Sequence, residues 1–180
     1  MIKTVSVYCA SSDRINGIYA KDAEKLGHLL GKRGLRVVNG AGSIGLMRIL
    51  SDAALSSGGT VTGVIPRFMV RNGWCHSALT ELITTETMHE RKKTMADMSD
   101  AAIALPGGYG TLEELLEIIT WRQLGLYSHP VIILNTNSYY APLLEMFRRA
   151  TEEHFIRGEQ SQLCRVAQTP EEVCEYLTLE

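Results

Sequence analysis

The sequence has no long apolar run and no long basic run, and these two absences exclude several classes of protein. No stretch approaches the ~20 consecutive apolar residues that a membrane-spanning helix needs, so we expect no membrane partner. The formal net charge of -2, without a basic cluster, argues against nucleic acid as a partner. The first three residues lead directly into a predicted strand without a signal-peptide pattern, and we expect a cytoplasmic protein.

The sequence also lacks paired cysteines. Its four cysteines, Cys9, Cys75, Cys164 and Cys174, are dispersed and show no C-x-x-C spacing. Neither a disulfide framework nor a zinc site is therefore indicated, and we expect no metal and reduced thiols.

What the sequence does contain is a regular alternation of short apolar segments and amphipathic segments. Strands are predicted at residues 4–9, 35–39, 60–65, 82–85, 100–105, 130–135 and 164–166, and helices at 19–32, 46–56, 87–99, 112–124, 139–155 and 170–177. With 180 residues, 45% of them hydrophobic, the chain suits one domain over residues 1–180. The alternation predicts an α/β fold, a doubly wound parallel sheet with helices on both faces, which binds ligands beyond the carboxyl ends of its strands.

A glycine-rich turn at residues 106–114, with the sequence PGGYGTLEE, joins one of these apolar strands to a helix. Three glycines in four residues leave backbone N–H groups free to face an anion, at the positive end of the helix dipole. This pattern predicts a phosphate site. A purely structural interpretation stays open, because Thr111 and Glu114 also fit the S/T-x-x-E capping box and the glycines suit any tight turn.

A second glycine loop, GAGSIG at residues 40–45, spells G-x-G-x-x-G between a strand and a helix, where a dinucleotide fingerprint belongs. The acidic residue expected at the end of the next strand is missing, and that strand ends in Pro66-Arg67. An arginine there suits a 2'-phosphate, so NADP stays open. A mononucleotide fits equally well, and a dinucleotide cofactor ranks second.

The predicted helix at residues 87–99 directs two cations inward. Met88 and Met95 define its apolar stripe, and Arg91 and Lys92 lie three and four residues after Met88 on the same stripe. Two inward cations need an anionic partner, unless the stripe is misplaced by one residue. The polar and aromatic segment 68–78, which has no clear period, is predicted to be a loop over the site or a surface connection anchored by Trp74.

Together these motifs resemble those of the LOG ("lonely guy") family, the cytokinin riboside 5'-monophosphate phosphoribohydrolases. The P-G-G-x-G-T-x-x-E motif matches residues 106–114 and the M-H-x-R-K motif matches residues 88–92. Residues 9–12, 42–47 and 63–66 are similar to further family segments, so the likeness covers nearly the whole chain. The chain departs from the family pattern at Asn39, Ala41, Arg48 and residues 68–78, which bears on substrate choice more than on chemistry.

The resemblance implies one Rossmann-like nucleotide-binding domain that hydrolyses the N-glycosidic bond of an adenine or N6-modified adenine nucleoside 5'-monophosphate, without a cofactor. It implies that Arg91 and Glu114 are catalytic. The substrate-binding residues it implies are Ser11, Gly42, Met88, Arg91, Lys92, Gly107, Gly108, Tyr109, Gly110, Thr111 and Glu113.

The residue types suit this chemistry. A carboxylate beneath the sugar stabilises an oxocarbenium-like transition state and can activate water, which fits Glu114. Arg91 does not lose its proton at neutral pH, so we expect it to orient Glu114 or contact the nucleotide.

Two other functions stay open. One is a non-catalytic carrier of a nucleotide or of the molybdenum cofactor, against which the presence of Arg91 and Glu114 counts. The other is a pyridoxal phosphate lysine decarboxylase, for which the sequence offers no Ser-x-His-Lys stretch. The apolar residues Ile118, Ile119, Trp121 and Leu124 near the end of one helix favour a homodimer, or else an ordinary buried helix.

Overall fold

A computed structural model describes residues 2–156 and 163–179 of the chain. Their strands form a seven-stranded sheet with the order β4-β3-β2-β1-β5-β6-β7, and every neighbouring pair is parallel. The predicted doubly wound α/β fold is confirmed. The strands are β1 (Thr4–Tyr8), β2 (Arg36–Asn39), β3 (Thr60–Pro66), β4 (Glu81–Thr85), β5 (Ala101–Ala104), β6 (Val131–Leu134) and β7 (Arg165–Ala167).

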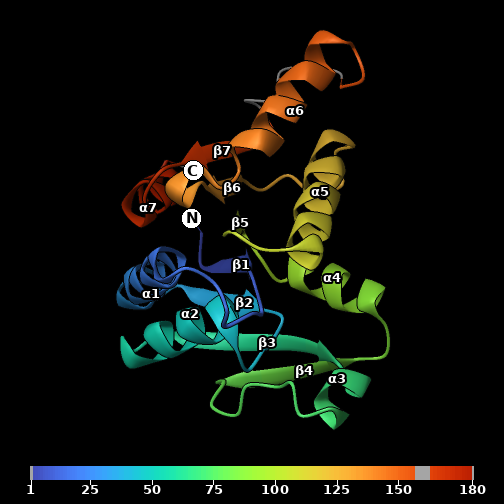
Figure 1. The fold of residues 1–180 in the computed structure, drawn as a ribbon. Coiled ribbons are helices and arrows are strands. Elements are labelled where there is room, and N and C mark those ends of the chain that lie inside the picture. Colours follow the sequence, from blue (N-terminus) through green and yellow to red (C-terminus); the bar gives the residue numbers. More distant parts are fainter. Residues whose placement is uncertain (1, 157–162, 180) are drawn as a thin grey trace.

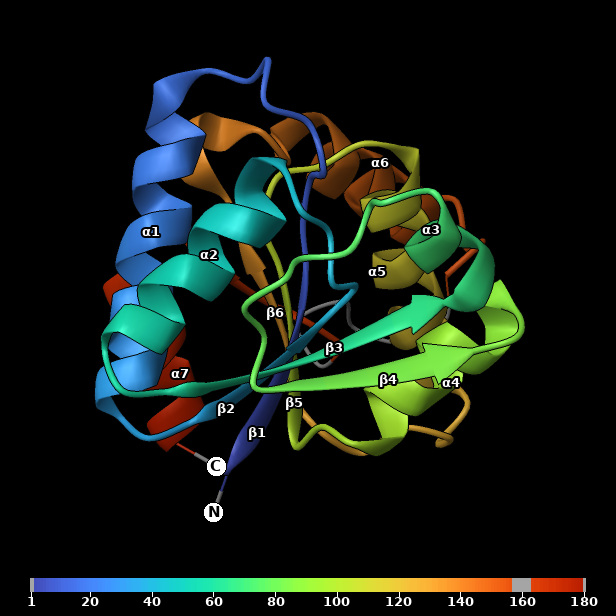
Figure 2. The same ribbon diagram turned by 90° about the horizontal axis from the view of Figure 1, so that it is seen from below.

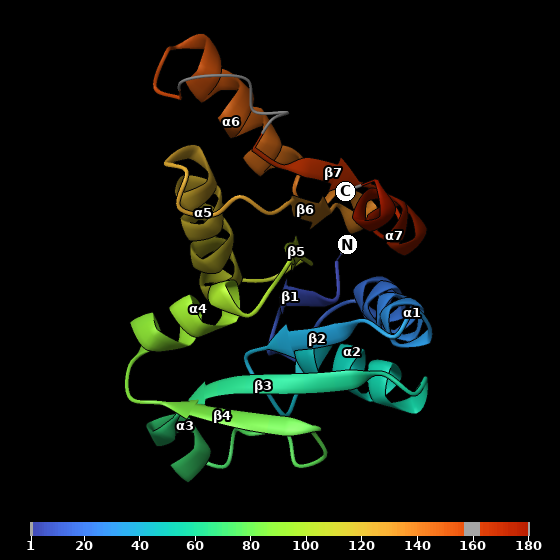
Figure 3. The ribbon, with the colours of Figure 1, turned by 180° about the vertical axis from the view of Figure 1, so that it is seen from behind.

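Helices cover both faces of this sheet. The helices are α1 (Gly17–Lys32), α2 (Gly45–Ser56), α3 (Arg67–Arg71), α4 (Met88–Asp97), α5 (Tyr109–Gln123), α6 (Ala141–Glu152) and α7 (Pro170–Thr178), with a 3-10 turn η1 (Thr136–Ser138) before α6. Helices α1, α2 and α7 lie on one side of the sheet, and α4 and α5 lie on the other (Figure 1). The reverse view shows the same division of the helices between the two faces (Figure 3). No helix of the described residues has the length and apolarity that a bilayer crossing requires.

Two hydrophobic cores follow from this layering, one on each face of the sheet. In β5, Ala101 and Ile103 pack with α1, α2 and α7, whereas Ala102 and Ala104 pack with α4 and α5. Because successive strand residues point to opposite faces, a strand covered on both sides must be apolar throughout. This explains why the central strands appear in the sequence as continuous apolar runs.

β1 and β5 lie side by side at the centre of the sheet. From β1 the chain adds successive strands toward one edge as far as β4, and from β5 it adds them toward the opposite edge, so the strand order reverses between β1 and β5. Such a reversal opens a crevice at the carboxyl ends of the two strands, where doubly wound folds bind ligands. Three loops meet there. The amide of Ala10, just after β1, donates to the carbonyl of Pro106 after β5 at 3.3 Å, and the carbonyl of Ala10 accepts from the amide of Met47 in α2 at 3.2 Å.

Two segments differ from the sequence-based expectation. Residues 68–78 are not entirely loop, since α3 occupies their first part, and the rest runs back past the start of α2 to reach β4 (Figure 2). Trp74 does not anchor this segment, because it is 50% exposed, whereas His76 is buried. The helix predicted from residue 139 begins instead at Ala141, because η1 and a further turn precede it.

Candidate active site

The loop between β5 and α5 presents unpaired backbone donors. Helix α5 is N-capped by Gly108, which has no side chain to bond the first-turn amides. Among the described residues, no hydrogen bond is donated by the amide of Gly107 or of Gly108. The free N–H groups of a helix N-terminus and its dipole together attract an anion. The geometry therefore agrees with the phosphate site predicted for this loop.

The capping-box interpretation of Thr111 and Glu114 is wrong. Helix α5 begins at Tyr109, so Thr111 lies inside its first turn and does not cap it. Thr111 is buried and packs against Gly107, where an added Cβ would lie 2.1 Å from its Oγ1. Glu114 is thus free of any capping duty, and its side chain is only 10% exposed.

Arg91 reaches the same crevice from α4. Its side chain is 8% exposed, and its Nε donates to the carbonyl of Val64 at 3.1 Å. Its Nη2 donates to the carbonyl of Gly40 at 3.4 Å and lies 4.0 Å from Oε1 of Glu114. The inward direction predicted for Arg91 is confirmed, and the structure brings the two expected catalytic residues together.

A real capping box fixes the orientation of α4. Thr87 accepts a hydrogen bond from the amide of Glu90, and the Glu90 side chain bonds back to the amide of Thr87. This cap sets where the helix starts and therefore which residues face the sheet. Arg91 and Lys92 are buried, while Met88 is exposed and its sulfur lies 3.8 Å from Arg91 Nη1.

Burial determines the acidity of Glu114. It raises the pKa of this carboxyl to about 7, against the opposing effect of the Arg91 charge. The negative charge of Glu113 adds to the rise, and Lys92 opposes it. A carboxyl with this pKa holds and releases a proton near neutral pH, which is the property of a general base or acid.

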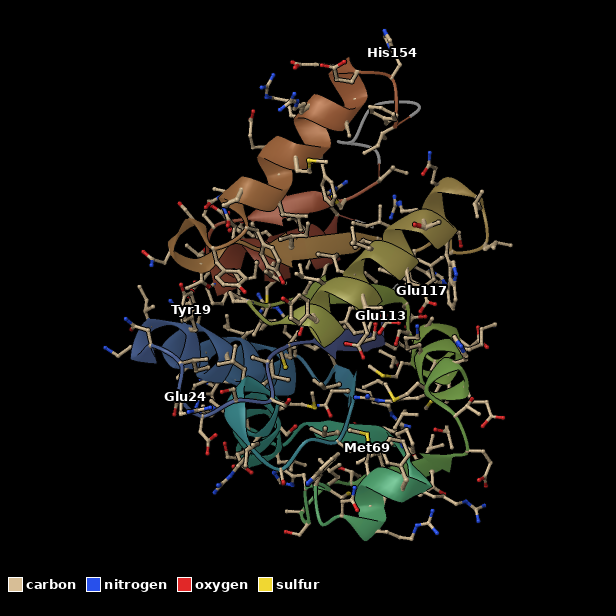
Figure 4. The ribbon with its side chains drawn as sticks, turned by 45° about the vertical axis from the view of Figure 1, so that its right-hand side comes forward. Tyr19, Glu24, Met69, Glu113, Glu117 and His154 are labelled. Atoms are coloured by element: carbon tan, nitrogen blue, oxygen red, sulfur yellow. The ribbon has the colours of Figure 1, made fainter. Side chains whose placement is uncertain are left out.

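Lys92 is held in an ion-pair cluster between α4 and α5. Its Nζ lies 2.9 Å from Oε1 of Glu113 and 3.1 Å from Oε1 of Glu117. Burial alone would lower the pKa of Lys92, but the hydrogen bonds to these two carboxylates raise it. Glu113 and Glu117 lie on the side of α5 that faces α4 (Figure 4). Substrate contact by Lys92 and Glu113 stays a prediction, and their visible contact is with each other.

The glycine loop at residues 40–45 has a different construction. A Cβ on Gly40 would lie 1.7 Å from Arg91 Nη2, and one on Gly45 would lie 2.5 Å from the backbone nitrogen of Ser12. The amide of Gly42 is directed at the sulfur of Met47 at 2.9 Å. These glycines make room for neighbouring groups, and Gly45 brings the loop carrying Ser11 against the start of α2.

Residues 74–76 close the outer side of this loop, a role that the sequence did not reveal. The carbonyl of Trp74 accepts from the amide of Ser43 at 3.0 Å, and the amide of His76 donates to the carbonyl of Ala41 at 2.8 Å. The His76 ring lies 2.9 Å from Asp52 of α2. His76 belongs to no periodic pattern or motif in the sequence, so only its contacts in the structure show that it holds the loop at residues 40–45 in place.

The predicted substrate-binding residues divide into two groups by exposure. Ser11, Gly42, Met88, Gly108, Tyr109 and Gly110 are at least partly open on the rim, as is Glu113, whereas Arg91, Lys92, Gly107 and Thr111 are buried. The rim group is available to a ligand directly, and the buried group shapes the crevice beneath it.

The fold and this crevice define an α/β protein with a candidate anion-binding loop beside a buried arginine–carboxylate pair. A family model described as "Possible lysine decarboxylase" matches residues 47–177. A probable cytokinin riboside 5'-monophosphate phosphoribohydrolase of Oryza sativa subsp. japonica is 45% identical over 97% of this chain and 72% of its own length. A cytokinin riboside 5'-monophosphate phosphoribohydrolase of Rhodococcoides fascians is 46% identical over 86% of this chain and 78% of its own length. The chain belongs to the family of these proteins, as its motifs predicted.

Solved structures share the fold at lower identity. The molybdenum cofactor binding protein of Rippkaea orientalis is 22% identical with a TM-score of 0.75, and the match covers 99% of this chain and 97% of that one. Likeness at this level shows the common Rossmann-like architecture.

Proposed function

We propose that the protein hydrolyses the N-glycosidic bond of an adenine or N6-modified adenine nucleoside 5'-monophosphate, giving the free base and ribose 5-phosphate. The observation that carries this proposal is the position of Glu114, buried beside Arg91 in the second turn of α5, whose start presents the unpaired amides. A phosphate on those amides places the ribose of the same nucleotide within the crevice. The phosphoribohydrolase activity for which the relatives are named supports the same assignment.

The carboxylate of Glu114 supplies the charge that the reaction needs. As the bond from the sugar to the base breaks, positive charge grows on the sugar, and a buried carboxylate stabilises it more strongly than water does. The bond from the sugar carbon to the base nitrogen breaks with its electron pair going to the base, and the oxygen of a water molecule bonds to that carbon. Glu114 takes one proton from this water, and a pKa of about 7 suits that transfer. The leaving base takes up one proton, from Glu114 or from solvent, so that one water is consumed in all. Arg91 donates to two backbone carbonyls, so its role is to hold its charge beside Glu114 and to orient that carboxylate.

A pyridoxal phosphate decarboxylase does not fit the lysine in this crevice. A Schiff-base lysine works as a free amine, which calls for a lowered pKa. Lys92 is bound by two carboxylates that raise its pKa instead. The description attached to the matching family model therefore finds no support in the chemistry of Lys92.

The test is to incubate the protein with AMP, GMP, CMP and isopentenyl-AMP and to separate the products. We expect free adenine or its prenyl derivative with ribose 5-phosphate, and much slower turnover of adenosine because it lacks the phosphate. Equal rates for adenosine and AMP would contradict the claim that the loop at residues 107–110 binds the substrate phosphate. Binding of AMP without turnover of any substrate would favour a carrier.

Glu114→Gln tests the catalytic role of the carboxylate, because the substitution keeps the shape of the side chain and removes its negative charge. We expect turnover to fall by roughly a hundredfold or more. The native pKa of about 7 exceeds the ordinary 4.5, so the charged carboxylate costs stability increasingly as pH rises through that window. The variant should therefore melt no lower than wild type at pH 8, which separates lost chemistry from a lost fold.

We also propose that the protein is a cytoplasmic homodimer. Several large apolar side chains on α5, α6 and the segments that follow them face outward: Leu116, Leu124, Leu126, Met146 and Phe155, the last 85% exposed. Exposed apolar side chains of this size suit contact with a second copy of the chain. The buried cysteines Cys9, Cys164 and Cys174 are unpaired thiols, which suits a reducing compartment. Sedimentation of wild type and Leu124→Glu tests the dimer: the variant should be monomeric.

A further inference from the structure

Two tyrosines from the segment between β6 and α6 hold the phosphate loop by its carbonyl groups. The Tyr139 hydroxyl donates to the carbonyl of Gly107 at 2.7 Å, and the Tyr140 hydroxyl donates to the carbonyl of Leu105 at 2.7 Å. The two rings meet edge to face, with centroids 5.1 Å apart. The reaction proposed above gives neither residue a role, and no motif in the sequence pointed to them.

The two hydrogen bonds have different consequences for the loop. In a trans peptide the carbonyl of one residue and the N–H of the next point in opposite directions. A bond that holds the Gly107 carbonyl on the Tyr139 side therefore holds the Gly108 N–H away from it. The Leu105 carbonyl precedes Pro106, which has no N–H, so Tyr140 orients no donor at all.

The segment that carries the tyrosines is built at a conformational cost. Asn137 and Ser138 both have left-handed backbone angles, with φ of 52° and 56°, which residues with side chains rarely adopt. Contacts with α1 and with Asn135 hold this turn in place. Thr136 Oγ1 donates to Asp22 at 2.5 Å, and the amide of Tyr140 donates to Asn135 Oδ1 at 2.8 Å.

Tyr139 also contacts Tyr19, which projects from the first turn of α1 (Figure 4). The two rings meet edge to face, with centroids 5.8 Å apart. A strained turn that is held by several contacts and directs two hydroxyls at carbonyls of the phosphate loop is the kind of backbone outlier that marks a functional constraint. Tyr139 is 40% exposed, so burial of its ring contributes little stability that would explain the strained turn.

We infer that Tyr139 is a positioning residue for the phosphate: its hydroxyl fixes the Gly107–Gly108 peptide so that the Gly108 N–H faces the bound phosphate. The inference rests on the proposed function for the identity of the ligand. It assigns to Tyr140 a purely structural role, although Tyr140 makes an equally short bond to the same loop.

The experiment compares Tyr139→Phe with Tyr140→Phe, each of which removes one hydroxyl. For Tyr139→Phe we expect KM for AMP to rise about tenfold, the cost of one well-placed hydrogen bond, with kcat within twofold and adenosine turnover unchanged. Tyr140→Phe leaves a buried carbonyl unpaired, so its melting temperature should fall while KM for AMP stays at the wild-type value.

An unchanged KM in Tyr139→Phe, or an equal loss for AMP and adenosine, would overturn the inference. If wild type turns over no nucleotide, the proposed function fails separately, and calorimetry with AMP and ribose 5-phosphate tests the positioning role alone. Weaker binding by Tyr139→Phe than by Tyr140→Phe then supports it, and equal binding by the two variants overturns it.

Discussion

The two glycine loops of this protein look alike in sequence and do different work. In the loop at residues 40–45, Gly40 and Gly45 are needed because a Cβ would collide with Arg91 or with the backbone at Ser12. In the loop at residues 107–110, a Cβ on Gly108 or Gly110 would meet nothing within 4 Å. The first loop uses glycine to bring parts of the protein together. The second makes room for Thr111 at Gly107, but it keeps Gly108 and Gly110 where the protein itself leaves space, and we attribute that space to the ligand.

The largest effect expected from this contrast is on folding. Gly45→Ala combines a left-handed φ of 68° with a Cβ 2.5 Å from the Ser12 backbone, and it should lower the free energy of unfolding by about 3 kcal/mol or more. Gly58→Ala is the control, since Gly58 has φ of 79° but open space around it, and it should cost about 1 kcal/mol. Chemical denaturation measures both, and equal losses would show that the close approach to Ser12 is unimportant.

Gly40→Ala should act on catalysis more than on folding. The added methyl occupies the position of Arg91 Nη2 and forces the guanidinium away from Glu114. Displacing a catalytic group by about 1 Å can cost on the order of a hundredfold in rate. We expect kcat to fall by about this factor with KM for AMP little changed, as steady-state kinetics would reveal. A rise in KM without a fall in kcat would instead indicate that the loop at residues 40–45 contacts the substrate phosphate.

The pH dependence should respond to the charges around Glu114. Because the carboxylate is the active form, kcat should rise with pH and level off above about pH 7. Lys92 lowers the pKa of Glu114 and Glu113 raises it, so Lys92→Met should move the rising limb to higher pH and Glu113→Gln to lower pH. The substrate phosphate titrates near pH 6, so AMP binding is measured across the same range as a control. Shifts of the same sign in both variants would contradict the electrostatic account.

The smallest expected effect lies at Ala41, which has φ of 58° beside Gly40. Glycine adopts this conformation without the steric cost that alanine pays, so Ala41→Gly should raise the free energy of unfolding by up to about 1 kcal/mol. Its methyl faces Gly63, where a Cβ would lie 2.6 Å away. A thermal melt checks this, and a marked loss of stability would mean that packing of the methyl outweighs the strain.

Much of the fold was predictable because burial on both faces leaves a plain signal. Strands such as β5 and β6 are apolar at every position, and the parallel α/β fold follows from their alternation with helices. The order of the strands was not predictable, because it depends on packing between segments far apart in the chain. Helix starts were the weakest point: α5 begins two residues before Thr111, and that shift removed the predicted capping box.

The sequence predicted those parts of the candidate site that depend on a local pattern of residues. It did not predict the parts that depend on contacts between segments brought together by the fold. The inward positions of Arg91 and Lys92 follow from helical spacing within α4. Three contacts of the site join elements that are distant in sequence. They are the ion pair of Lys92 with Glu117, the contact of His76 with Asp52 and the hydrogen bond from Tyr139 to Gly107. Nothing in the spacing of residues encodes such contacts, so they had to await the three-dimensional structure.

The contrast between the two loops is tested most directly by the affinity of Gly110→Ala for AMP, measured by calorimetry beside its melting temperature. Gly110 lies in the first turn of α5, where alanine favours the helix by about 0.5–1 kcal/mol, and its Cβ leans toward the N-terminal end where we place the phosphate. We predict that binding weakens at least about tenfold while the melting temperature stays the same or rises. Unchanged AMP affinity, or weaker binding accompanied by a lower melting temperature, would contradict the claim that this loop keeps Gly108 and Gly110 for the ligand.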